Sequence, residues 1–240
     1  MKISPTLTEV KEIAKTGKYD ILPVSCEILS DFITPIEAMR ILQNVSTHCY
    51  LLESAQANEA WGRYTFLGYD PKLEINCIDG HMKLGKLSVE TENPSEYIRQ
   101  ILSEYKSPKF DYLPSFTGGL VGYFSYDYLG YKEKSIRGKA RDTEDFKDVD
   151  LMLFDKVIAF DNLCQKIILI ANMSLDAPET GYNKAIVELK QLRELLMYGE
   201  KKQNMGGKLL GDVTPLFDKE QYCEMVEKAK RHIKEGALLQ

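Results

Sequence analysis

The sequence predicts an α+β fold in which antiparallel sheets pack as a sandwich and helices lie outside. Two turn-forming pairs, Asp79-Gly80 and Asp161-Asn162, each separate two strand-like runs, which indicates hairpins of antiparallel strands. A helix-like segment that begins at Thr34 leads directly into a further strand-like run. This direct succession of a helix and a strand is typical of the α+β class.

Length and composition are those of an ordinary globular chain. The 240 residues are 44% hydrophobic and 28% charged, enough for one large domain or two smaller ones. A net charge of −5 and the lack of a Lys/Arg-rich run argue against a nucleic-acid partner. No apolar run reaches the roughly 18 residues of a membrane span. The amino terminus has no signal-peptide pattern and the five cysteines form no CxxC pair, so we expect reduced thiols and the cytoplasm.

Helices are predicted from their caps and from the spacing of apolar residues. Three of them begin where a polar N-cap precedes proline, at Ser4-Pro5, Thr34-Pro35 and Asn93-Pro94. The predicted inward-facing residues of the second are Ile36, Met39 and Leu42. A longer helix is predicted over residues 182–197, and the last begins with the capping pair Asp218 and Gln221 and ends at Gly236.

Strands are predicted from alternating patterns and from apolar runs bounded by turn residues. The predicted strands cover residues 21–29, 50–52, 63–67, 72–77, 81–89, 151–160 and 164–171. The last two are apolar at nearly every central position, as in strands buried on both faces. The β-favouring run 116–131 contains Gly118, Gly119 and Gly122, which indicates a bulge or the close approach of another backbone.

Two stretches lack regular patterns. Residues 132–150 are charged with few large apolar side chains, so we expect a mobile loop. Residues 198–215 hold several glycines and lysines without periodicity, which predicts a linker. We therefore place one domain at residues 1–212 and the start of a second at residues 213–240.

The stretch 50–71 contains the candidate binding site. Glu53 and Ser54 stand at the mouth of a buried strand, where a carboxylate and a hydroxyl need partners or solvent. Such a pair can hold the ammonium or amide group of a small ligand. Arg63 is predicted to pair with a carboxylate such as Glu59 rather than with a ligand. Without a ligand, the stretch is a hairpin-like connection with a solvated strand end.

Three motifs resemble one enzyme family. LLES at 51–54, followed by GRYTFLGYDP at 62–71, resembles the amino-terminal signature of anthranilate synthase component I, which makes anthranilate from chorismate in tryptophan biosynthesis. GGLVGYFSYD at 118–127 resembles a glycine-aromatic strand of the same aminase-type domain, and residues 217–236 resemble the first helix of the family's chorismate-binding domain. The resemblance thus implies a regulatory domain at 1–212 and one helix of the next domain at 213–240.

The resemblance also implies a tryptophan feedback site. In that site, Glu53 or nearby carbonyls would neutralise the amino group of tryptophan and Ser54 would hydrogen-bond the ligand. Leu52 would line the pocket for the indole ring. The family's catalytic histidine, magnesium-binding glutamates and chorismate contacts belong to the part of the chorismate-binding domain beyond Gly236. We therefore assign no catalytic and no metal-binding residue in this chain, and expect no activity and weak or no tryptophan binding from it alone.

The resemblance implies a glutamine amidotransferase subunit, which delivers ammonia, as the partner. Whether the chain also forms a homodimer is left open.

Two other functions are compatible with the sequence. Aminodeoxychorismate synthase component I, of the folate pathway, has a similar amino-terminal domain, although the LLES-to-GRYTFLG pattern favours the anthranilate branch. A non-catalytic small-molecule-binding module fits a chain whose histidines, His48, His81 and His232, are predicted to be surface or satisfied residues without carboxylates at ligand spacing.

The last helix generates a test. Tyr222, Val226, Ala229 and Ile233 form its apolar face, and a lone helix of this length is marginal in water. We predict that the helix packs on its own domain or on a neighbouring molecule. Hydrogen exchange of the amides of residues 218–236 should show protection, and exchange at the full rate of an unstructured peptide would contradict the packing.

Overall fold

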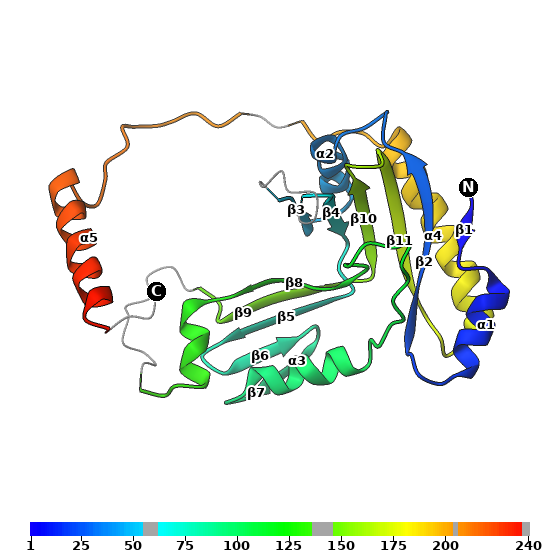
Figure 1. The fold of residues 1–240 in the computed structure, drawn as a ribbon, viewed down its shortest axis with the longest axis horizontal. Coiled ribbons are helices and arrows are strands. Elements are labelled where there is room, and N and C mark those ends of the chain that lie inside the picture. The colour runs from blue at the N-terminus through cyan, green and yellow to red at the C-terminus, as the bar shows by residue number, and fades with distance from the viewer. Residues whose placement is uncertain (55–61, 136–145, 204–205, 237–240) are drawn as a thin grey trace. The chain divides into compact units, whose positions relative to one another are not determined.

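The computed structural model describes residues 1–54, 62–135, 146–203 and 206–236 (Figure 1). The chain divides into two compact units, Met1–Gln203 and Asn204–Gln240. The division lies within the predicted linker. Among the helices of the described ranges, none combines the length and the apolar character needed to cross a membrane.

Sheet A is antiparallel, with its strands in the order β1-β2-β11-β10-β4-β3. These strands are β1 (Ile3–Ser4), β2 (Ile21–Leu29), β3 (Cys49–Leu52), β4 (Tyr64–Tyr69), β10 (Lys156–Asp161) and β11 (Lys166–Ser174). β10 and β11 lie in the middle of the sheet, and nearly every residue of both is buried. This confirms that the apolar runs in this part of the chain are central strands.

Sheet B is also antiparallel, in the order β7-β6-β5-β9-β8. Its strands are β5 (Leu73–Ile78), β6 (His81–Leu84), β7 (Leu87–Glu90), β8 (Gly119–Phe124) and β9 (Val149–Phe154). They run across the direction of the sheet A strands (Figure 1).

Two predictions of single strands were wrong. The run 81–89 turns at Gly85, whose φ is 58°, and the run 151–160 leaves sheet B and enters sheet A at Asp155.

The chain passes between the two sheets at two adjacent places. One connection leads from β4 to β5, and the other, through Asp155, leads from β9 to β10. Lys156 Nζ lies 2.8 Å from Asp70 Oδ2, and the backbone N–H of Lys72 donates to the carbonyl of Leu153 at 2.7 Å. These contacts tie the two connections together and fix the junction of the sheets.

Helices cover the outer faces of both sheets. α1 (Leu7–Lys15), α2 (Pro35–Val45) and α4 (Pro178–Tyr198) pack on sheet A, α3 (Pro94–Ser103) packs on sheet B, and a 3-10 helix, η1, spans Tyr126–Tyr131 (Figure 1). The largest buried cluster lies between sheet A and its helices and includes Leu42, Leu169 and Leu189. A second cluster under α3 includes Met82 and Ile98. The α+β class with antiparallel sheets and outer helices is confirmed.

The helix starts were predicted more accurately than the inward faces. Thr6, not Ser4, is the N-cap of α1, because its hydroxyl accepts from the N–H of Glu9 and the Glu9 carboxylate accepts from the N–H of Thr6. Thr34 caps α2 as predicted. Ile36, predicted to face inward, is 59% exposed. The buried residues of α2 are Ala38, Ile41 and Leu42.

The glycine-rich strand β8 makes the close backbone approach that the sequence predicted. Gly122 has a φ of 152°, and a Cβ built there would lie 1.9 Å from the carbonyl oxygen of Asp150 on β9. Only glycine fits this position. Residues 136–145 of the predicted mobile loop lie outside the described residues.

The second unit contains α5 (Lys219–Lys234). Its predicted capping box is present, since Asp218 Oδ1 accepts from the N–H of Gln221 at 2.8 Å and Gln221 Oε1 accepts from the N–H of Asp218 at 3.1 Å. Gly236 follows with a left-handed φ of 73°, as expected for a helix stop. None of the α5 residues is buried in this unit. The predicted packing of this helix stays a prediction.

A glycine at the centre of the β3–β4 pair allows a direct test of the packing. Gly68 lies opposite Tyr50, and a Cβ at Gly68 would lie 2.2 Å from Cε1 of the Tyr50 ring. We expect Gly68→Ala to lower the free energy of unfolding by about 2 kcal/mol, measured by urea denaturation. Gly211→Ala is the control, because nothing lies within 4 Å of its added Cβ. Equal stabilities of the two variants would contradict this packing.

Candidate functional site

The candidate site lies at the open end of the edge strand β3. Leu52 is its last residue and pairs with Phe66 on β4. Leu52 is 47% exposed, and Glu53 and Ser54 are exposed directly after it. The structure thus places the three predicted site residues consecutively at a solvent-facing strand end, where a carboxylate and a hydroxyl can reach a ligand.

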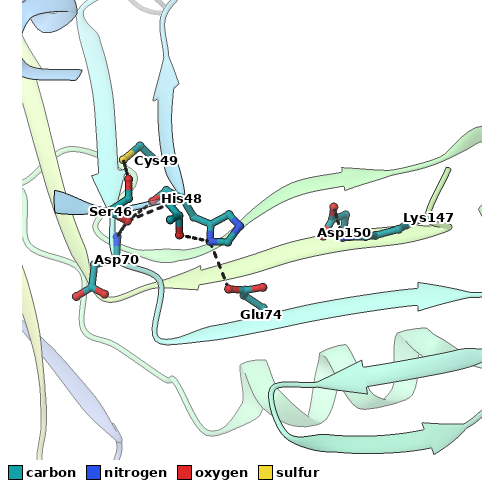
Figure 2. A network of polar contacts seen from close by, with 8 residues as sticks. Ser46, His48, Cys49, Asp70, Glu74, Lys147 and Asp150 are labelled. Carbon is teal, nitrogen blue, oxygen red and sulfur yellow. Dashed lines mark hydrogen bonds and ion pairs between the residues drawn. The ribbon is translucent and has the colours of Figure 1, made fainter. Parts of the chain in front are cut away.

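The entry to β3 is fixed by a polar network around Ser46 (Figure 2). Its hydroxyl donates to the carbonyl of His48 at 2.8 Å and accepts from the N–H of Asp70 at 3.0 Å. The Sγ of Cys49 lies 3.7 Å from the carbonyl oxygen of Ser46. Because Asp70 belongs to the connection between the sheets, this network holds the base of β3 against the sheet junction.

His48 adds a contact between the two sheets. Its Nδ1 lies 3.4 Å from Oε1 of Glu74 on β5, as Figure 2 shows. His81 and His232 also each lie near one glutamate, at 3.3 Å and 3.7 Å. His81 is exposed, and His48 and His232 are half-buried. All three are therefore surface or satisfied residues, as predicted. His81 meets Glu90 through the pairing of β6 with β7, and His48 meets Glu74 where the two sheets come together. The spacing of these residues in the sequence does not show either contact.

Arg63 anchors the start of β4 to a distant hairpin. Its Nε and Nη2 donate to the two carboxylate oxygens of Asp161 at 3.1 Å and 2.6 Å. Arg63 was predicted to be an ion-pair residue, and it is one, but the partner found is Asp161 rather than Glu59. Glu59 lies outside the described residues. A bidentate pair of this kind fixes direction as well as distance.

The Asp161 side chain also organises its own turn. It is 4% exposed, and its Oδ1 accepts from the N–H groups of Leu163 and Cys164 at 3.1 Å and 3.0 Å. Burial alone would raise the pKa of this carboxyl, but the hydrogen bonds from Arg63 and Cys164 lower the pKa below its ordinary value. The N–H of Asn162 donates to the carbonyl of Arg63 at 2.8 Å, which closes the link between turn and strand.

A row of aromatic rings lies beside the site on the face of sheet A opposite the helices. The ring centroids of Tyr50 and Phe116 are 6.4 Å apart, those of Phe116 and Phe66 5.6 Å, and those of Phe66 and Tyr64 5.8 Å. Tyr50 is 8% exposed, and burial raises the pKa of its hydroxyl. That hydroxyl has no hydrogen-bond partner among the described residues. Sequence reasoning missed this row, although the aromatic residues at alternating positions 64 and 66 pointed to it.

The arrangement suits binding of a small polar molecule. Glu53 can accept hydrogen bonds from an ammonium group, Ser54 can donate or accept one, and Leu52 offers apolar contact. Within the described ranges, no group of three or more His, Cys, Asp and Glu side chains could hold a metal ion.

Comparisons with known proteins place this geometry in context. Residues 47–240 match the family model described as chorismate binding enzyme. The chain is 32% identical to anthranilate synthase component 1 of Acetivibrio thermocellus over 98% of this chain and 49% of that protein. It is 30% identical to anthranilate synthase component 1 of Aquifex aeolicus over 100% of this chain and 50% of that protein. The chain therefore spans about half the length of these curated relatives.

A solved structure supports the fold. The crystal structure of anthranilate synthase component I from Streptococcus pneumoniae TIGR4 aligns with a TM-score of 0.52 at 24% sequence identity. The alignment covers 87% of this chain and 45% of that chain. This likeness concerns the arrangement of helices and strands.

The Asp161 pair generates a prediction on pH dependence. Because its folded pKa lies below the unfolded value of about 3.9, the pair stabilises the protein above that pH and loses this effect as pH falls through the folded pKa. We expect Asp161→Asn to lower the free energy of unfolding by about 2 kcal/mol at neutral pH. Denaturant unfolding should show the difference from the wild type shrinking in acid.

The matched control is Glu27→Gln, which changes a carboxylate paired with Lys166 at 2.9 Å on the same sheet. Both of those side chains are more than 40% exposed, with values of 51% and 42%, so the change should have little effect. A loss for Asp161→Asn no larger than the control's, or one independent of pH, would contradict the role given to Asp161.

Proposed function

The chain belongs to the chorismate binding enzyme family, and from this we propose that it is the amino-terminal, regulatory part of an anthranilate synthase component 1. The whole enzyme would act as a lyase on chorismate, using ammonia from glutamine and releasing anthranilate and pyruvate for tryptophan biosynthesis. The observation that carries the proposal is that proteins of this name match nearly the full length of the chain.

The site supports a regulatory role for this part. Leu52, Glu53 and Ser54 are exposed at the end of a strand whose base and neighbour are anchored by Ser46 and Arg63. We propose that Glu53 holds the ammonium group of free tryptophan, Ser54 hydrogen-bonds its polar end, and Leu52 contacts the indole. These residues would supply one half of the feedback site, and the chorismate-binding part of the enzyme would supply the other.

The chemistry itself would belong to the rest of the enzyme. Magnesium, which the resemblance implies, would be held there as well. This chain alone is therefore proposed to be inactive.

The proposed partner is a glutamine amidotransferase subunit, and the proposed compartment is the cytoplasm. Whether the chain forms a homodimer is left open. Aminodeoxychorismate synthase component I is the second candidate, and the names of the relatives favour the first.

Tryptophan titration followed by amide NMR tests this function. We expect saturable shifts at residues 49–54 with a dissociation constant far weaker than micromolar, because half of the contacts would be missing. Glu53→Gln should remove most of the shift, since the ammonium group loses its counter-charge. Glu96→Gln, on α3, is the control and should leave it unchanged. Micromolar affinity in calorimetry, or shifts confined to other regions, would contradict the half-site.

A further inference from the structure

A groove that we call the α1 groove lies next to β1, at one edge of sheet A, whereas the candidate site at β3 lies at the opposite edge. Its cavity volume of about 420 Å³ is within the range of small-molecule sites. Two separate parts of the chain form it. α1 and the residue before its cap contribute Pro5, Glu9, Glu12 and Ile13, and the connection after α3 contributes Phe110 and Tyr112.

The apolar part of the α1 groove is built on two aromatic rings. The ring centroids of Phe110 and Tyr112 are 5.1 Å apart and their planes are inclined by 27°, so the rings are stacked. Phe110 is half-buried and packs against the core of sheet A, which holds the pair in place. Tyr112 is 47% exposed. With Pro5 and Ile13, the pair forms an apolar surface that a ligand can still reach.

The charged part of the α1 groove is acidic. Glu9 and Glu12 lie three positions apart on one side of the helix, and none of the described residues that line the groove is a lysine, arginine or histidine. Glu12 Oε1 lies 2.7 Å from Lys15 Nζ, but these side chains are 66% and 70% exposed, so the pair is weak. The N-terminus of α1 adds only about half a positive elementary charge. The two carboxylates therefore leave the groove negative.

The Glu9 carboxylate is held in a fixed orientation. Its Oε2 accepts from the N–H of Thr6 at 2.7 Å and from the Thr6 hydroxyl at 2.8 Å, and these bonds lower the pKa of the carboxyl, which stays ionised. Its Oε1 has no hydrogen bond to any residue that the structure describes, so it can accept one from a ligand. Burial, together with the charge of Glu9, raises the pKa of Tyr112 to about 12, so its phenol stays neutral.

We propose that the α1 groove binds a small organic cation with an apolar body, of the arylalkyl ammonium class. The ammonium group binds at Glu9, and the apolar body lies on Phe110 and Tyr112. An ammonium group is attracted both to a carboxylate and to the face of an aromatic ring, and the apolar body gains by leaving water. Binding therefore needs the charge and the body together. This site is separate from the effector site and does not depend on the function proposed above.

Amide NMR titration of the full chain with millimolar probes tests the proposal. The probes are 2-phenylethylammonium, 2-phenylethanol, which has the same apolar body without the charge, and ethylammonium, which has the charge without the ring. We expect saturable shifts at residues 6–13 and 109–113 with 2-phenylethylammonium. The affinities for 2-phenylethanol and for ethylammonium should each be about threefold to tenfold weaker.

Glu9→Gln removes the charge and keeps an oxygen that can accept the capping bonds. We expect it to weaken 2-phenylethylammonium binding about threefold while leaving 2-phenylethanol binding unchanged. Glu37→Gln is the matched control, because Glu37 holds the same place in the capping box of α2, with Thr34, and does not line the groove. Its change should leave both affinities unaltered. Circular dichroism melting of each variant confirms that it is folded.

Each outcome supports or overturns the site. If 2-phenylethylammonium and 2-phenylethanol bind the wild-type chain equally well, the preference for a cation is wrong. If Glu37→Gln weakens binding as much as Glu9→Gln does, the effect is one of overall charge and the assignment to Glu9 fails. If 2-phenylethylammonium gives no saturable shifts at residues 6–13 and 109–113, the α1 groove is not a binding site.

Discussion

The junction between the two sheets is the constraint on which the rest of the first unit depends. Both connections between the sheets pass this point, and backbone polar groups that leave one sheet before entering another need partners. The hydrogen bond from the N–H of Lys72 to the carbonyl of Leu153 supplies one such partner, and the side-chain pair between Lys156 and Asp70 ties the two connections together. Asn172 adds two more, since its Nδ2 donates to the carbonyls of Thr117 and Asp155 at 2.6 Å and 3.0 Å. Burial alone would lower the pKa of Lys156, but the bond to Asp70 raises it, so the ammonium stays charged.

Contacts at this junction fix the position of the candidate site. Asp70 is shared, because its carboxylate binds Lys156 and its N–H binds Ser46 at the entry to β3. Away from the junction, Arg63 and Asp161 fix the start of β4 to the hairpin between β10 and β11. The exposed end of β3 thus lies between two anchored points, and these anchors support Leu52, Glu53 and Ser54, the residues proposed to bind the effector. A site on an edge strand also leaves room for a second surface to complete it.

Local sequence signals predicted the parts of this structure that depend on local chemistry. The capping pair of Asp218 and Gln221, the cap at Thr34 and the hairpin turns were all readable, because a cap or turn depends on residues three or four positions apart. The strand before Glu53 was readable from its apolar run. The division at Asp155 was not, since the runs on both sides are equally apolar and only the partner strands differ.

Long-range contacts account for what the sequence could not show. Arg63 was expected to find a nearby carboxylate, but Asp161 lies 98 residues away and becomes its neighbour through the pairing of β4 with β10. Glu74 approaches His48 only because two sheets meet. The aromatic row likewise depends on β3, β4 and residue Phe116 coming together. In each case the residue type was informative and the partner was decided by the fold.

The most direct measurement of the central claim is a set of intermolecular nuclear Overhauser effects between tryptophan and selectively methyl-labelled protein. The claim is that the end of β3 forms an effector half-site. It predicts contacts from the indole protons to the methyl groups of Leu52, with none to those of Leu113 or Ile168 farther along the same face. Indole contacts that omit Leu52, or that reach other regions of the chain, would contradict the account.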